Sequence, residues 1–237
     1  MFWTEESIAF LRDAAAINRY YETIAERITP QLPENAHVCD AGCGIGELSL
    51  ALKPYCHHVT AVDADELAIK TLKAHLIEGV TARCGDMETL APEKPYDAMV
   101  FCLFGRTQDT LRIAKKQCRG RIFLVKRDYS HHRFSAGKVS LGEYTAGSTE
   151  NVLREKGIPY TVERFTAEFG QPFRSLEAAE RFFALYNRSA SEVLPKDEIK
   201  ARLTAGPSAE FPYYLPHKKA LCLFTIEMAA ISKEEAV

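Results

Sequence analysis

The feature that most constrains the fold is a cluster of three glycines directly after a short apolar segment. Residues 36–40 have the pattern of a buried β-strand that ends at Asp40. Glycine permits positive φ angles and lets the backbone pass close to a ligand. The segment therefore predicts a strand, a tight ligand-binding turn and the beginning of a helix. The glycines alternate with other residues at Gly42, Gly44 and Gly46.

The segments after this turn alternate between strand-like and helix-like patterns. Strands are predicted over 58–63, 80–84, 96–104 and 121–125, and helices over 66–77 and 107–117. Such alternation is typical of βαβ units and a parallel sheet. The alternation loosens after Asp128, and the later elements are a helix over 149–156 and strands over 160–165 and 219–228.

We therefore expect an α/β protein built on an open, mostly parallel, Rossmann-like sheet of seven strands with helices on both faces. Residues 1–33 are expected to form an N-terminal helical cap, in which apolar residues from Ile17 to Ile28 share one face. The sheet domain is expected over 34–169 and 217–230. Between these parts, 170–216 is predicted as a helical insertion that acts as a substrate lid, with helices at 175–187 and 195–204.

Composition excludes several classes of protein. The 237 residues hold 30 Lys+Arg and 32 Asp+Glu, and this balance argues against a protein that coats nucleic acid or an acidic membrane. Apolar runs such as 98–104 are far shorter than the ~20 residues of a membrane helix. The acidic beginning does not resemble a secretory signal. Seven cysteines without CxxC spacing indicate free thiols and a cytoplasmic location, and no metal site is expected.

The order D-x-G-x-G-x-G resembles motif I of the class I S-adenosylmethionine-dependent methyltransferases. A dinucleotide-binding turn needs G-x-G-x-x-G, and its third glycine would fall at Glu47, an unfavourable neighbour for a pyrophosphate. S-adenosylmethionine carries a sulfonium and an ammonium but no phosphate, so acidic neighbours suit it. The resemblance implies that this cofactor is contacted by Asp40, Gly42, Cys43, Gly44 and Gly46.

Further motifs of that family follow in the expected order. Asp63, followed by Ala64, ends the second strand, where the family places an acidic residue that binds both ribose hydroxyls. The alternative for Asp63 is a helix N-cap. Asp86 and Met87 resemble the adenine-side motif, in which the carboxylate accepts from the adenine amino group and the thioether lies against the ring. An ordinary acidic turn is the alternative there.

The fourth predicted strand ends where the family places the methionine arm and the transferred methyl group. Phe101 and Cys102 occupy this end and are expected to contact the cofactor, although Cys43 and Cys102 also fit buried, inert thiols. Tyr21, on the helix before motif I, either closes over the cofactor or packs in the core.

The resemblance implies a methyltransferase that uses S-adenosyl-L-methionine and releases S-adenosyl-L-homocysteine. Methyl transfer is an in-line displacement, so the protein mainly positions the acceptor, and a general base is needed only if the acceptor loses a proton. No catalytic residue is assigned from the sequence. A small-molecule acceptor is the leading hypothesis. RNA or protein methylation and a non-catalytic cofactor sensor stay open, and the sequence carries no signal for an oligomeric state.

The acceptor side is indicated by a basic segment. Residues 105–133 contain nine Lys/Arg and two acidic residues, although many of these fit the solvated face of a helix. The segment 126–132 follows the fifth strand, at the edge where open α/β sheets bind ligands, and suggests an anionic acceptor. Aromatic residues of the insertion suggest an aromatic acceptor or simply core packing. The named candidates are Lys126 and Arg127 for binding, and His131, His132 and His217 as bases or ordinary surface histidines.

Overall fold

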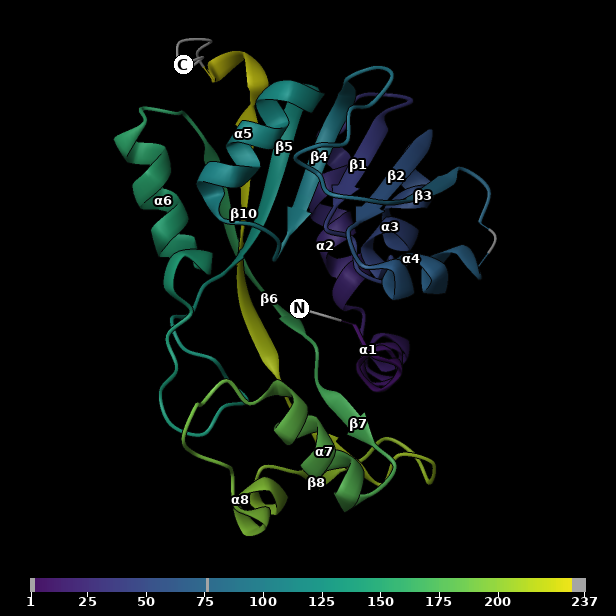
Figure 1. Cartoon of the computed structure of the whole chain (residues 1–237), viewed down its shortest axis with the longest axis vertical. Helices are drawn as coiled ribbons and strands as arrows, with labels where there is room; N and C mark the ends of the chain where they lie inside the picture. The colour runs from purple at the N-terminus through teal and green to yellow at the C-terminus, as the bar shows by residue number, and fades with distance from the viewer. Residues whose placement is uncertain (1–2, 76, 232–237) are drawn as a thin grey trace.

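The computed structural model describes residues 3–75 and 77–231. Its centre is a seven-stranded sheet with the order β3-β2-β1-β4-β5-β10-β6 (Figure 1). The strands β3, β2, β1, β4 and β5 are parallel, and β10 runs antiparallel between β5 and β6. The predicted mixed α/β fold is confirmed. The bounds are β1 (His37–Ala41), β2 (His58–Asp63), β3 (Val80–Cys84), β4 (Tyr96–Cys102), β5 (Cys118–Arg127), β6 (Thr161–Glu168) and β10 (Lys218–Glu227).

Helices cover both faces of this sheet. Successive residues of a strand point to opposite faces, and apolar side chains on each face pack against helices. On β1, Val38 packs in the cluster that contains α2 and α3, whereas Cys39 packs in the cluster that contains α5 and α6. The α-helices of this part are α1 (Glu5–Ile17), α2 (Tyr20–Ile28), α3 (Glu47–Leu52), α4 (Glu66–Lys73), α5 (Thr107–Gln117) and α6 (Ala146–Glu155). Short 3₁₀ helices are η1 (Thr29–Gln31), η2 (Lys53–Tyr55), η3 (Gly142–Tyr144) and η4 (Met228–Ala230).

The N-terminal part contains two helices where the sequence pattern indicated one segment. Thr4 begins α1 through a reciprocal capping box with Ser7, with N···O distances of 2.9 and 3.1 Å. Asn18 then separates α1 from α2, because its side-chain amide donates to Ala14 O at 2.7 Å and to Gly170 O at 2.9 Å. The break therefore depends on a residue 152 positions away, which local periodicity cannot show.

The sequence pattern predicts a helical insertion over 170–216, but the structure also contains strands in this segment. It contains a three-stranded sheet of order β7-β9-β8 beside its two helices. The predicted helix at 195–204 ends early, because Thr204 already belongs to a strand. The predicted helix at 66–77 ends at Lys73, and Leu76 lies outside the described residues. The bounds are β7 (Gln171–Phe173), α7 (Leu176–Tyr186), α8 (Lys196–Ala201), β8 (Thr204–Ala205) and β9 (Tyr213–Leu215).

The N-terminal helix α1 and the segment 170–216 share a core of their own. The Phe10 ring of α1 makes edge contacts with Phe173 and Phe182, at 6.1 and 5.3 Å between ring centroids. Ion pairs join the same two parts at the surface, for example between Arg181 and Glu6 at 2.7 Å. Figure 1 shows α1 and α7 at the same end of the molecule, beyond the carboxyl ends of the parallel strands.

Candidate active site

A cavity of about 1010 Å³ lies at the carboxyl ends of the parallel strands. The strand order reverses between β1 and β4, and ligands of open α/β folds bind at such a switch point. Each strand of this edge contributes the residues that follow it, and α1 and α2 close the cavity from the N-terminal side. The lining includes Trp3, Leu11, Tyr20, Tyr21, Asp40, Gly42, Cys43, Gly44, Glu47, Leu48, Val62, Asp63, Ala64, Asp65, Glu66, Leu67, Gly85, Asp86, Met87, Cys102, Leu103, Phe104, Gly105, Arg127, Phe169 and Lys219.

The glycine turn after β1 uses its own amide groups to hold the neighbouring strand. The N–H groups of Gly42 and Cys43 donate to the Val62 carbonyl at 2.8 and 3.0 Å, and the N–H of Gly44 donates to Asp63 Oδ2 at 2.8 Å. A phosphate-binding turn would offer such groups to its ligand. This turn therefore does not suit the pyrophosphate of a dinucleotide.

Close approach at the turn requires glycine. Gly44 has a φ of +55°, and a Cβ there would lie 2.6 Å from the Trp3 ring. Gly46 has a φ of +87°, and a Cβ there would lie 2.4 Å from the Leu72 side chain of α4. Because Gly44 has no side chain, Trp3, just before α1, can lie over the turn. Because Gly46 has none, α3 can begin close to α4.

Acidic side chains dominate the half of the cavity around β1 and β2. Asp40 is buried and accepts a hydrogen bond from Ser49 Oγ at 2.6 Å, and burial raises the pKa of its carboxyl to about 6. Burial also raises the pKa of Glu47. Asp63 and Asp86 line the same half. A ligand with positive charge fits these surroundings better than one with phosphates.

The comparisons agree with this geometry. Residues 38–119 match the family model described as a methyltransferase domain. The match identifies a methyltransferase domain within this chain. A search of curated proteins found no significant match.

Solved structures show the same fold. A candidate type II methyltransferase from Anaeromyxobacter dehalogenans is 16% identical, with a TM-score of 0.56 over 89% of this chain and 97% of that chain. The YcgJ protein from Bacillus subtilis is 15% identical, with a TM-score of 0.53 over 85% and 97% of the two chains. A candidate methyltransferase from Bacillus halodurans C-125 is 15% identical, with a TM-score of 0.51 over 87% and 98%.

Asp63 of this methyltransferase is held rigidly at the end of β2. Its Oδ1 accepts from the Asp65 N–H at 3.0 Å, and its Oδ2 accepts from Gly44. Asp65, not Asp63, caps α4 by accepting from the Ala68 N–H at 3.0 Å. The helix-cap alternative for Asp63 is therefore taken by its neighbour. Each oxygen of the Asp63 carboxylate keeps a further lone pair for a ligand.

Most of the other residues expected at the cofactor line the cavity, and two do not. Phe101 is fully buried and stacks on Phe104, with ring centroids 6.5 Å apart, and Gly46 faces α4. Burial raises the pKa of Cys102 to about 12, which keeps this thiol protonated and inert. The expected residues that line the cavity are Asp40, Gly42, Cys43, Gly44, Asp63, Ala64, Asp86, Met87, Cys102 and Tyr21.

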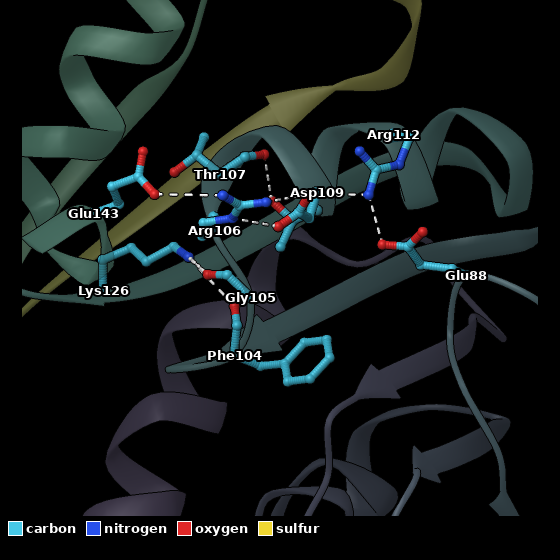
Figure 2. A network of polar contacts seen from close by, with 10 residues as sticks. Glu88, Phe104, Gly105, Arg106, Thr107, Asp109, Arg112, Lys126 and Glu143 are labelled. Carbon is cyan, nitrogen blue, oxygen red and sulfur yellow. Dashed lines mark hydrogen bonds and ion pairs between the residues drawn. The ribbon is translucent and has the colours of Figure 1, made fainter. Parts of the chain in front are cut away.

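Lys126 and Arg127, the last two residues of β5, point to opposite faces of the sheet. Arg127 lines the cavity, but Lys126 does not. Figure 2 shows the Lys126 ammonium directed at the chain between β4 and α5, where it donates to the carbonyls of Gly105 at 2.7 Å and Phe104 at 3.3 Å. The prediction that Lys126 faces the acceptor is therefore wrong. Lys126 instead holds the segment 103–105, which itself lines the cavity.

Many arginines of the basic segment form ion pairs. Figure 2 shows Arg106 with Asp109 at 2.8 Å and Arg112 with Glu88 at 2.5 Å. Arg119 pairs with Asp97, and Arg121 pairs with Glu227 at 2.5 Å. Three of these four arginines thus pair with carboxylates from outside the segment, at Glu88, Asp97 and Glu227.

None of the three candidate histidines lines the cavity. His131 is exposed and forms a hydrogen bond with Ser130 Oγ at 2.8 Å. Burial lowers the pKa of His132 to about 4 and that of His217 to about 3. His217 packs against Phe134 at 4.9 Å between ring centroids, and its Nε2 has no hydrogen-bond partner. None of the three histidines is therefore placed to act as a base in the cavity.

The described residues of 170–216 do not line the cavity. Their aromatic side chains pack with one another and with Phe10, so the role of this segment as a lid stays a prediction.

No described helix has the length and apolar character needed to cross a membrane.

Several lining residues were missed by sequence reasoning. Lys219 is the clearest case, with Trp3 and Leu11. The sequence did place the last strand at residue 219. Because this strand runs antiparallel to β5, its first residues lie beside the carboxyl end of β5, at the ligand-binding edge. The direction of the strand is therefore the signal that could have identified Lys219.

Proposed function

We propose that this methyltransferase transfers a methyl group from S-adenosylmethionine to a small molecule held inside the cavity. The volume of about 1010 Å³ carries the proposal. Pockets for one drug-sized ligand occupy roughly 300–1,000 Å³. The cavity is at the upper end of this range, which leaves room for a small acceptor beside the cofactor. Residues of α1 and α2 line it.

The cofactor fits the acidic half. Asp63 would accept hydrogen bonds from the ribose hydroxyls, and Asp86 with Met87 would hold the adenine. The carboxylates of Asp40 and Glu47 favour the cationic end of the ligand.

The chemistry that S-adenosylmethionine supplies is an activated methyl group on a sulfonium. The protein contributes alignment and exclusion of water. Tyr20, Tyr21 and Phe169 provide an aromatic wall, with ring centroids 4.4 Å apart for Tyr20 and Phe169 and 5.6 Å apart for Tyr21 and Phe169. This wall lines the cavity near Cys102, at the end of the central strand β4.

The ion pairs of the basic segment favour a small acceptor over RNA. A surface that binds phosphates needs arginines and lysines that are available to them. In the described residues, Arg106, Arg112, Arg119 and Arg121 each pair with a carboxylate.

The test measures release of S-adenosylhomocysteine by mass spectrometry. The purified enzyme is incubated with S-adenosylmethionine and with a metabolite extract, total RNA or a denatured protein extract in parallel. The proposal expects product with the metabolite extract alone. Methylated RNA or protein would contradict the acceptor class. Cofactor binding without product in any extract would indicate a sensor instead of an enzyme acting on small molecules.

A further inference from the structure

Two basic side chains occupy the end of the cavity opposite the acidic half. Arg127 comes from the end of β5 and Lys219 from the beginning of the neighbouring antiparallel strand β10. Neither cation lies within ion-pair distance of an Asp or Glu of the described chain. Unpaired charges in a confined cavity are unfavourable unless a ligand neutralises them.

The surroundings of Lys219 confine its ammonium group. Its Nζ lies 4.2 Å from the centre of the Phe169 ring and 4.7 Å from the centre of the Tyr20 ring. Burial, together with the charge of Arg127, lowers the Lys219 pKa to about 7. Cys102 from β4 and His217 from the preceding turn are the other titratable groups that interact with it.

A third polar group at this end lacks a partner. The Tyr20 side chain is 1% exposed and lines the cavity, and its hydroxyl forms no hydrogen bond with the described residues. A buried hydroxyl without a partner costs about 1–3 kcal/mol. Tyr20 interacts electrostatically with both Arg127 and Cys102, which places its hydroxyl group at the same end of the cavity.

We propose that Arg127, Lys219 and Tyr20 form the acceptor subsite and that they bind the carboxylate of an aromatic acceptor. The inference rests on the proposed function, because it assigns the part of the cavity that the cofactor leaves free. A guanidinium, an ammonium and a hydroxyl can all donate to one carboxylate. The rings of Phe169 and Tyr21 offer apolar faces for the body of a planar molecule.

The sheet order gives this arrangement a direction. Asp40 and Asp63 lie at the carboxyl ends of β1 and β2, and Cys102 ends β4. Arg127 and Lys219 lie beyond them on β5 and β10. The positive end of the cofactor and the negative end of the acceptor are therefore drawn to opposite ends of one cavity. The two molecules then meet near β4, where the methyl group is transferred.

The experiment is a ¹⁹F NMR titration with 4-fluorobenzoate and its neutral isostere 4-fluorobenzamide. Both probes are added to the full-length enzyme, with and without saturating S-adenosylhomocysteine. We expect benzoate to bind more tightly than benzamide. Lys219→Met and Arg127→Met should each weaken benzoate binding by roughly 10- to 100-fold, as for loss of a charged hydrogen bond, and should leave benzamide binding unchanged. Lys218→Met is the matched control, because Lys218 is exposed and does not line the cavity.

Equal affinity for the two probes, or benzoate binding that both variants retain, would overturn the subsite. Calorimetric titration of S-adenosylhomocysteine into the same proteins separates this failure from failure of the proposed function. Absence of cofactor binding in the wild type would overturn the proposed function. The difference between benzoate and benzamide without cofactor would still test the subsite.

A second readout follows the proton of Lys219. Because the Lys219 pKa is about 7 in the free enzyme, benzoate binding above pH 7 should take up protons as the ammonium forms. Calorimetry in two buffers with different ionisation enthalpies measures this uptake. It should be present in the wild type and in Lys218→Met and absent in Lys219→Met. No uptake in the wild type would contradict the role of Lys219.

Discussion

Replacing Lys219 by Met should make the ligand-free enzyme more stable. The pKa of Lys219 falls from 10.5 to about 7 on folding, chiefly because of burial. At ~1.4 kcal/mol per pH unit, this lowering corresponds to at most about 5 kcal/mol of lost stability. Solvent in the cavity and two cation–π contacts, each worth about 0.5–2 kcal/mol, offset part of that loss. The net gain for Lys219→Met is then about 1–3 kcal/mol.

The pH dependence identifies the cause of this gain. Between pH 7 and 10.5 the unfolded chain keeps the Lys219 proton that the folded chain has lost, so wild-type stability rises with pH. Below pH 7 the buried Lys219 charge destabilises the folded protein to its full extent, and this loss of stability decreases as the pH approaches 10.5. The advantage of Lys219→Met should therefore be largest below pH 7 and shrink in alkaline solution.

Urea denaturation of the wild type, Lys219→Met and Lys218→Met across this pH range measures the effect. Lys218→Met should follow the wild type, because Lys218 is exposed. A Lys219→Met protein that is less stable than the wild type near pH 6.5 would refute the reasoning. A stability difference that does not change with pH would refute it equally. A gain of stability with loss of benzoate binding would show that the basic pair is kept for function.

Three other variants test the site. Gly44→Ala should lower both the free energy of unfolding and the free energy of cofactor binding by about 1–2 kcal/mol, because φ is +55° and Trp3 is 2.6 Å from the new Cβ; unchanged calorimetric affinity would contradict this. Lys126→Met should gain less stability below pH 7 than Lys219→Met, because burial lowers the Lys126 pKa only to about 8 and the change also removes the hydrogen bond to Gly105 O; an equal or larger gain in urea denaturation would count against this. His217→Phe should flatten the loss of stability as the pH falls from 6.5 towards 3, since the unfolded histidine binds a proton that the folded one does not; an unchanged slope in acid denaturation would argue against this.

The sheet and the cofactor half could be predicted from the sequence because their signals are local. A strand that ends in an acidic residue and enters a glycine turn specifies its own geometry within about ten residues. Asp63 and Asp86 are found in the same way, because Asp63 ends β2 and Asp86 lies two residues after β3. The parallel strand order then brings these turns together without further information.

The acceptor half could not be predicted in the same way. Lys126 and Arg127 are consecutive, and only the pleat of β5 decides that Arg127 faces the cavity while Lys126 faces α5. Lys219 reaches Arg127 only through the antiparallel register, in which Leu221 pairs with Arg127. The strands of two and three residues in 170–216 are too short to leave a pattern.

The most direct test of the central claim is calorimetric titration of S-adenosylmethionine into the wild type and Asp63→Asn. The account predicts a single site per chain in the wild type. Asp63→Asn should weaken binding by roughly 10- to 100-fold, as expected for a carboxylate that binds two hydroxyls. Glu93→Gln, a charge-removing change at an exposed position outside the cavity, should bind like the wild type. No binding to the wild type, or equal binding to Asp63→Asn, would contradict the account.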